Sequence, residues 1–99
     1  MLNIIKEREG DKLTVALEGR LDTTTSPDLE KSLNESISSV TELVLDFEKL
    51  DYISSAGLRV LLAAQKIMNK QGKMKLVHVN ETIMEIFEVT GFTDILTIE

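Results

Sequence analysis

The sequence predicts an α/β fold with a mixed, mostly parallel sheet and the element order β-β-α-β-α-β-α-β. Short alternating or continuously apolar segments are followed by segments whose apolar residues recur every three to four positions. Strand–helix alternation of this kind requires right-handed crossovers and parallel strands, whereas a short turn makes the first two strands antiparallel. With 99 residues, the chain is expected to form a single domain over residues 1–99.

The first half of the chain contains a hairpin, a helix and a buried strand. The turn Gly10–Asp11 separates LNIIKERE from KLTVALEG, and the second segment alternates apolar and polar residues. Ser26 is the predicted N-cap of the next helix, with Pro27 at its first position. The apolar run ELVLDF, residues 42–47, is typical of a strand buried on both faces. The predicted helix has one apolar stripe at four-residue spacing, formed by Leu29, Leu33 and Ile37.

The second half contains two helices and two strands. The stretch DYISSAGLRVLL begins the central helix, which is expected to end near Gly72. KMKLVHV is the next predicted strand, and Asn80 is the expected N-cap of the helix ETIMEIFEVTG, which Gly91 ends. DILTIE, residues 94–99, is predicted as a last strand.

A helical wheel divides the central helix into two sides at 100° per residue. The expected core side consists of Val60, Leu61, Ala64, Ile67 and Met68. The other side is mostly polar, with Gln65 and Asn69 at its margin, and consists of Ser55, Leu58, Arg59, Leu62 and Lys66. Leu58 and Leu62 therefore either cover a neighbouring loop or helix or form a small docking surface for another protein.

Composition excludes several classes of function. The net charge of −6 argues against a general nucleic-acid binder and fits a partner that is basic or neutral. Without cysteine there are no disulfides and no thiolate chemistry, and a single histidine, His78, rules out a histidine-rich metal site. No apolar run is long enough to span a bilayer and no signal peptide is recognised, so we expect a cytoplasmic protein without a membrane partner.

Ser55 is the candidate functional residue at the start of the central helix, for which it is the predicted N-cap. The position follows a buried strand and therefore lies at the carboxyl edge of a parallel sheet, where such folds place their sites. A helix N-terminus also tolerates an added phosphate. Gly57 is expected to keep the surface bare, so that another protein can approach the hydroxyl. Asp22, in the polar loop GRLDTTTS, either orients Ser55 or the adjoining backbone or fixes its own loop.

Catalytic and metal sites are not favoured. A nucleophile elbow needs glycine two residues before the serine, where this chain has Ile53, and the expected position of His78 is mid-strand. A P-loop sequence is absent. Three aspartates that could bind a metal, Asp22, Asp46 and Asp51, are dispersed over loop and strand ends. Solvation or local capping is the preferred interpretation for at least two of them, and Asp22 in its polar loop is the exception. We therefore expect no catalytic residue, cofactor or metal.

Three segments of the chain carry a family resemblance: EGRLDTTTSPDLEKSL, LVLDFEKLDYISSAGLRVLL and LVHVNETIMEIFEVTGFTDILTI. They resemble the bacterial anti-sigma factor antagonists, the STAS domains, over essentially the whole chain. In that family a cognate anti-sigma factor, itself a serine kinase, phosphorylates the serine two positions before the glycine, which implies Ser55. Asp22 matches the acidic loop residue of the family. Many members have Asp directly before the acceptor and Ser or Thr directly after it. This chain has Ser54 and Ala56 at those positions, so Ser54 remains the alternative acceptor.

The resemblance implies partner switching without catalysis by the protein itself. The unphosphorylated form would bind the anti-sigma factor and free the sigma factor, phosphorylation would end that binding, and a serine phosphatase would reset the switch. The predicted partner-binding residues are Asp22, Thr23, Ser54, Gly57, Leu58, Arg59 and Leu62. Two alternatives stay open. One is a STAS scaffold or sensor in another signalling pathway that binds a nucleotide or lipid, and the other is a small enzyme that uses Ser55.

Overall fold

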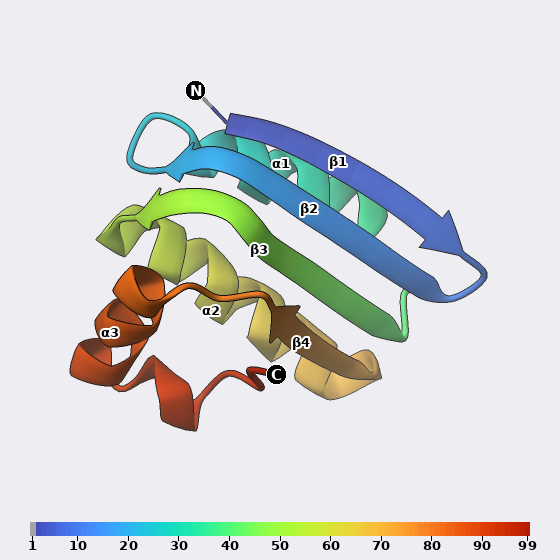
Figure 1. Cartoon of the computed structure of the whole chain (residues 1–99). Helices are drawn as coiled ribbons and strands as arrows, with labels where there is room; N and C mark the ends of the chain where they lie inside the picture. Colours follow the sequence, from blue (N-terminus) through green and yellow to red (C-terminus); the bar gives the residue numbers. More distant parts are fainter. Residues whose placement is uncertain (1) are drawn as a thin grey trace.

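Four strands form one mixed sheet in the order β1-β2-β3-β4 in this computed structural model, which describes residues 2–99 (Figure 1). The strands β1 and β2 are antiparallel, whereas β2, β3 and β4 are parallel, as the sequence predicts. Gly10 adopts a left-handed φ of 58° in the β1–β2 turn. The strand bounds are β1 Leu2–Glu9, β2 Lys12–Leu21, β3 Glu42–Ile53 and β4 Lys73–Val77.

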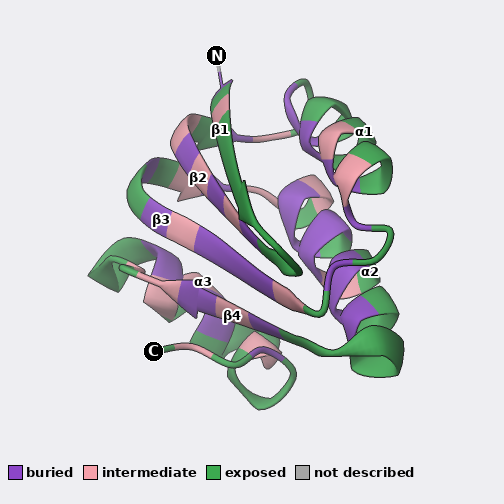
Figure 2. Cartoon of the chain, turned by 90° about the vertical axis from the view of Figure 1, so that its right-hand side faces the viewer, coloured by how far each residue is buried: buried purple, intermediate pink, exposed green. Residues whose placement is uncertain are grey.

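Three helices connect and cover these strands. The helices α1 and α2 lie side by side against one face of the sheet, and their facing sides are buried (Figure 2). The third helix, α3, packs against β3, where the ring centroids of Phe47, in the middle of the strand, and Phe87 are 6.3 Å apart. The bounds are α1 Ser26–Ser36, α2 Ser55–Gln71, α3 Glu81–Thr90 and a short 3-10 helix, η1, Phe92–Asp94. None of the helices in residues 2–99 is long and apolar enough to cross a membrane.

Several predicted strands have other bounds in the structure. The strand predicted over KMKLVHV ends at Val77, two residues early. The run predicted as residues 42–47 is the first half of a twelve-residue strand, β3, which continues to Ile53 past two register shifts of the β-bulge type against β2. These shifts disturb the alternation that would have revealed the second half. The predicted last strand, residues 94–99, is reduced to one parallel bridge between Leu76 and Ile98. Its predicted first residue, Asp94, belongs to the 3-10 helix η1 instead.

The helix ends are partly as expected. Asn80 caps α3 by accepting a hydrogen bond of 2.9 Å from the Ile83 N–H, and Gly91 ends α3 in the left-handed conformation with φ 80°. Gly72 ends α2 as expected. The prediction for α1 is wrong by one residue: Thr25 is the N-cap, and Ser26 is the first helical residue, buried with its hydroxyl donating to the Asp22 carbonyl.

The wheel of α2 is rotated from the one predicted. Ile67 was expected in the core but is 36% exposed, whereas Gln65 was expected at the polar margin and is only 6% exposed. The Gln65 side-chain amide donates to Asn69 Oδ1 at 2.8 Å. The core is completed on this helix by Leu58, Val60, Leu61, Ala64 and Met68. The helix α2 contacts α1 as well as the strands β3 and β4, so its buried side is wider than one stripe.

Candidate functional site

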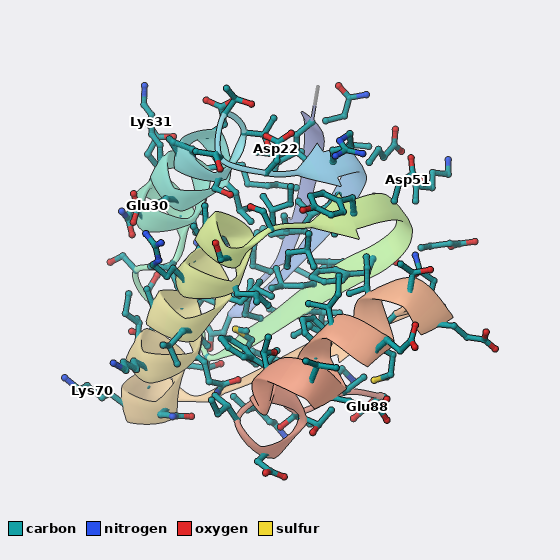
Figure 3. The ribbon with its side chains drawn as sticks, turned by 90° about the vertical axis from the view of Figure 1, so that its left-hand side faces the viewer. Asp22, Glu30, Lys31, Asp51, Lys70 and Glu88 are labelled. Atoms are coloured by element: carbon teal, nitrogen blue, oxygen red, sulfur yellow. The ribbon has the colours of Figure 1, made fainter. Side chains whose placement is uncertain are left out.

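The start of α2 lies at the carboxyl edge of the sheet, directly beside the end of β2. Leu21 and Ile53 are paired neighbours at the ends of β2 and β3. One residue later, the Ser54 N–H donates a hydrogen bond of 2.9 Å to the Leu21 carbonyl oxygen. The loop that begins at Asp22 therefore starts next to the first turn of α2, and both lie at the same end of the molecule (Figure 3).

Two serines at this point have different surroundings. Ser54, not Ser55, is the N-cap residue, with extended backbone angles of φ −101° and ψ 175°. Its Oγ is buried and has no hydrogen-bond partner within residues 2–99, so it does not cap the helix through its side chain. Ser55 is the first helical residue and is exposed. The prediction of Ser55 as the N-cap is thus wrong by one residue, but Ser55 carries the accessible hydroxyl.

Gly57 has a packing role in place of the one predicted. It is buried, and a Cβ atom added to it would lie 2.8 Å from both Ile53 Cγ1 and Leu21 Cγ. Such separations are shorter than atoms in contact can adopt. Glycine at this position lets the first turn of α2 lie closely on the ends of β2 and β3, and it does not form a bare surface for a partner.

Asp22 fixes its own loop, which is one of the two roles considered for it. Its Oδ1 accepts hydrogen bonds from the Thr24 hydroxyl at 2.8 Å, the Thr24 N–H at 3.0 Å and the Thr25 N–H at 3.1 Å. The Thr24 hydroxyl and the Thr25 N–H in particular lower the pKa of the Asp22 carboxyl, because they stabilise its charged form. Thr23 lies exposed in the same loop.

Arg20 extends this loop region toward β3. Its guanidinium carbon lies 4.4 Å from the centroid of the Tyr52 ring, in cation–π geometry, and its Nε is 3.8 Å from Asp22 Oδ2. Arg20 and Tyr52 are also paired across β2 and β3. No local pattern in the sequence predicts this pair, because the contact between Arg20 and Tyr52 depends on the register between two strands.

The predicted leucine stripe on α2 is only partly exposed. Leu58 is 7% exposed and belongs to the hydrophobic core, so its expected position on a solvent-facing stripe is wrong. Leu62 is half-buried, and Arg59 is exposed one turn after Ser55. Of the predicted partner-binding residues, Gly57 and Leu58 are therefore inaccessible, whereas Thr23, Arg59 and part of Leu62 remain on the surface.

Electrostatically, α2 differs from the rest of the chain. It contains no aspartate or glutamate, although the protein has a net charge of −6. Its basic residues, Arg59, Lys66 and Lys70, are all exposed. This basic helix face in an acidic protein is readable from the sequence alone, from the charges of these three residues.

A second polar cluster lies where β3 and β4 run side by side. His78 Nδ1 is 2.9 Å from Asp46 Oδ1 and 4.0 Å from Glu48 Oε1. His78 was expected mid-strand, but it follows β4, is exposed and has a φ of 58°. The hydrogen bond to Asp46 raises the pKa of the imidazole. No short motif in the sequence reveals this group, because its members are up to 32 residues apart.

Comparison with known families decides the classification. The STAS domain profile matches residues 3–99. The chain belongs to the STAS domain family. It is 36% identical over 88 residues to BtrV of Bordetella bronchiseptica, named a putative anti-sigma factor antagonist. The alignment covers 87% of this chain and 76% of that protein. The anti-sigma-B factor antagonists of Listeria monocytogenes and Bacillus subtilis are each 30% identical to this STAS domain, covering 96% and 95% of it and 85% and 86% of their own lengths.

Solved structures agree on the fold of this STAS domain. An anti-sigma factor antagonist from Mycobacterium paratuberculosis superposes with a TM-score of 0.90 at 20% identity, over 99% of this chain and 85% of that one. Unphosphorylated SpoIIAA superposes with a TM-score of 0.78 at 19% identity, over 98% and 87% of the two chains. The predicted STAS-type fold is thereby confirmed.

Proposed function

We propose that this STAS domain is an anti-sigma factor antagonist that acts by partner switching. Its unphosphorylated form would bind an anti-sigma factor with serine kinase activity, and phosphorylation of Ser55 would end that binding. The observation that carries the proposal is the contrast between adjacent serines: Ser55 is exposed on the first turn of α2, whereas the Ser54 hydroxyl is buried. The names of the relatives that align with nearly the whole chain support the same role.

The docking surface would consist of the exposed side of the first turns of α2 and the adjoining Asp22 loop. Thr23, Ser55, Arg59 and the accessible part of Leu62 are available there, whereas Leu58 is in the core. Because α2 carries three basic residues and no acidic one, this surface fits a partner that presents acidic side chains. The partner proposed here is therefore acidic at the contact, which replaces the basic or neutral partner that the net charge of −6 alone suggests.

Phosphorylation would act on this surface through its charge. A phosphoryl group adds about −1.5 to −2 charges at neutral pH. At position 55 it would lie one turn before Arg59, within reach of an ion pair along the helix. The group would neutralise the cation that attracts the partner and would itself need desolvation in the interface. A penalty of about 2.7 kcal/mol would weaken the complex roughly a hundredfold.

The protein itself would supply no catalysis in this cycle. A serine nucleophile needs a base within hydrogen-bond distance, and the chain's one histidine, His78, is hydrogen-bonded to Asp46 instead. The Ser54 and Ser55 side chains have no hydrogen-bonded base within residues 2–99. A separate serine phosphatase would remove the phosphate and reset the switch.

Intact-mass measurement tests the proposed acceptor. The protein is incubated with ATP and the serine kinase that functions as its anti-sigma factor in the source bacterium. We expect a mass gain of one phosphate, its loss in Ser55→Ala and its persistence in the matched control Ser54→Ala. The opposite pattern would move the acceptor to Ser54. Partner binding without any mass gain would favour the scaffold or sensor alternative.

Binding measurements test the charge argument separately. Arg59→Gln should weaken the complex at least about tenfold, which corresponds to about 1.4 kcal/mol. Lys70→Gln is the matched control, because it removes the same charge from the last turn of the same helix. Equal effects of the two variants would mean that only the net charge matters and that the docking surface does not include the first turns of α2.

A further inference from the structure

Three metal-ligating side chains converge on the sheet away from the Ser55 region. Asp46 is paired with Val77, the last residue of β4, and His78 follows it outside the strand with a left-handed φ of 58°. The imidazole nitrogen Nδ1 lies 2.9 Å from Asp46 Oδ1 and 4.0 Å from Glu48 Oε1. One ligand atom from each of the three residues lies within 4.8 Å of the other two.

We propose that Asp46, Glu48 and His78 bind a divalent first-row transition-metal ion of the Zn²⁺ type. Bonds of about 2.0–2.2 Å from Zn²⁺ to nitrogen and oxygen place neighbouring ligand atoms about 3.3–3.6 Å apart in a tetrahedral site. The observed separations of 2.9 and 4.0 Å lie on either side of that distance. Small side-chain rotations would therefore bring the three atoms around one ion, with a water molecule as the fourth ligand.

The charges around the cluster favour a cation. Lys49, the basic residue next to Glu48, pairs instead with Glu18, with Nζ 3.7 Å from Glu18 Oε2. Within residues 2–99, no lysine or arginine nitrogen lies within ion-pair distance of the Asp46 or Glu48 carboxylate. Two carboxylates thus meet one imidazole without a basic partner. A divalent ion would balance both of them.

Access and ligand chemistry decide which ion fits. The side chains of His78 and Glu48 are 59% and 68% exposed, so an ion can enter from solvent and keep a water ligand. An imidazole ligand favours zinc, nickel, copper or iron, whereas calcium and magnesium prefer sites made of oxygen atoms alone. The site should therefore discriminate against Ca²⁺ and Mg²⁺. Coordination through Nδ1 requires the neutral imidazole with its proton on Nε2, so the ring binds the ion as that tautomer.

Titration with Zn²⁺ alone tests the proposal on the whole chain. Calorimetry measures the Zn²⁺ affinity at a pH at which the imidazole is neutral. Proton NMR follows the ring signals of His78, the one histidine of the chain. We expect Zn²⁺ to shift the His78 ring signals and Mg²⁺ at the same concentration to leave them unchanged. His78→Gln and Glu48→Gln should each weaken Zn²⁺ binding at least tenfold.

The matched control is Glu7→Gln, which removes one exposed carboxylate from β1, two strands away from β3. Its Zn²⁺ affinity should equal that of the unmodified protein. His78 and Glu48 are both exposed, and far-UV circular dichroism with thermal unfolding verifies that the variants are folded. Unchanged ring signals in Zn²⁺, or equal affinities for the control and the two cluster variants, would overturn the proposal and leave an ion pair only. Neither result bears on Ser55 phosphorylation.

Discussion

The Ser54 N–H and the Leu21 carbonyl oxygen are joined by a hydrogen bond of 2.9 Å, which ties the start of α2 to the end of β2. Because the two residues are 33 positions apart in the chain, this bond is formed only once β2 and β3 are paired. It places the exposed Ser55 and the Asp22 loop at one edge of the sheet. The proposed docking surface therefore depends on the integrity of this junction.

Gly57→Ala should disturb the junction directly. The added methyl group would lie 2.8 Å from Leu21 Cγ and Ile53 Cγ1, so either these side chains or the first turn of α2 must move. Overpacking of this kind costs about 1–3 kcal/mol, which urea-induced unfolding measures. Combining it with Leu21→Ala provides the control, since removal of one clashing side chain should reduce the additional cost of Gly57→Ala. Strictly additive costs would contradict the packing role of Gly57.

Leu58→Ala should destabilise the fold far more than Leu62→Ala. Leu58 is 7% exposed and in contact with the core, and truncating such a leucine costs about 2–5 kcal/mol. Leu62 is half-buried on the same helix and loses less burial, so it is the matched control. Thermal or urea unfolding of both variants measures which leucine contributes more to the stability of the fold. Equal stability of the two variants would restore the solvent-facing stripe that the helical wheel predicts.

Ser54→Ala should leave stability nearly unchanged, although Ser54 is an N-cap residue. Its hydroxyl is buried and has no hydrogen-bond partner within residues 2–99, so its removal loses no cap bond and relieves an unsatisfied polar group. Asn80→Ala is the contrast. Asn80 accepts from the Ile83 N–H and donates to the Leu50 carbonyl, and loss of such a cap costs about 0.5–2 kcal/mol. A Ser54→Ala variant as unstable as Asn80→Ala would show that the Ser54 hydroxyl caps α2.

Asp22 should contribute to stability in a pH-dependent way. Hydrogen bonds from the Thr24 hydroxyl and the Thr25 N–H lower its pKa in the folded state. The contribution is therefore fully present above the unfolded-state pKa of about 3.9 and is lost as the pH falls through the lower folded-state pKa. Thermal unfolding of the protein and of Asp22→Asn from neutral to strongly acidic pH measures this. The stability difference between them should shrink below about pH 4, and a constant difference would argue against the stabilised carboxylate.

Local patterns in the sequence predicted most of the secondary structure. The turn at Gly10, the cap at Asn80 and the helix end at Gly91 follow from backbone conformations that only certain residues favour, and the structure confirms them. The buried residues of α1 follow from their spacing. The missed second half of β3 and the reduced last strand have a different origin, because a bulge and a single bridge are set by partner strands and not by local periodicity.

The sequence by itself determined the fold class, the STAS resemblance and Ser55 as the candidate acceptor, since these depend on patterns within short segments. Only the tertiary structure distinguished the exposed Ser55 from the buried Ser54 hydroxyl, moved Leu58 into the core and gave Gly57 a packing role. It also placed His78 next to Asp46, although sequence analysis treated both as isolated. The physical reason is common to all these cases: burial and contact depend on the register between strands and the rotation of α2, which are set by packing between segments distant in the chain.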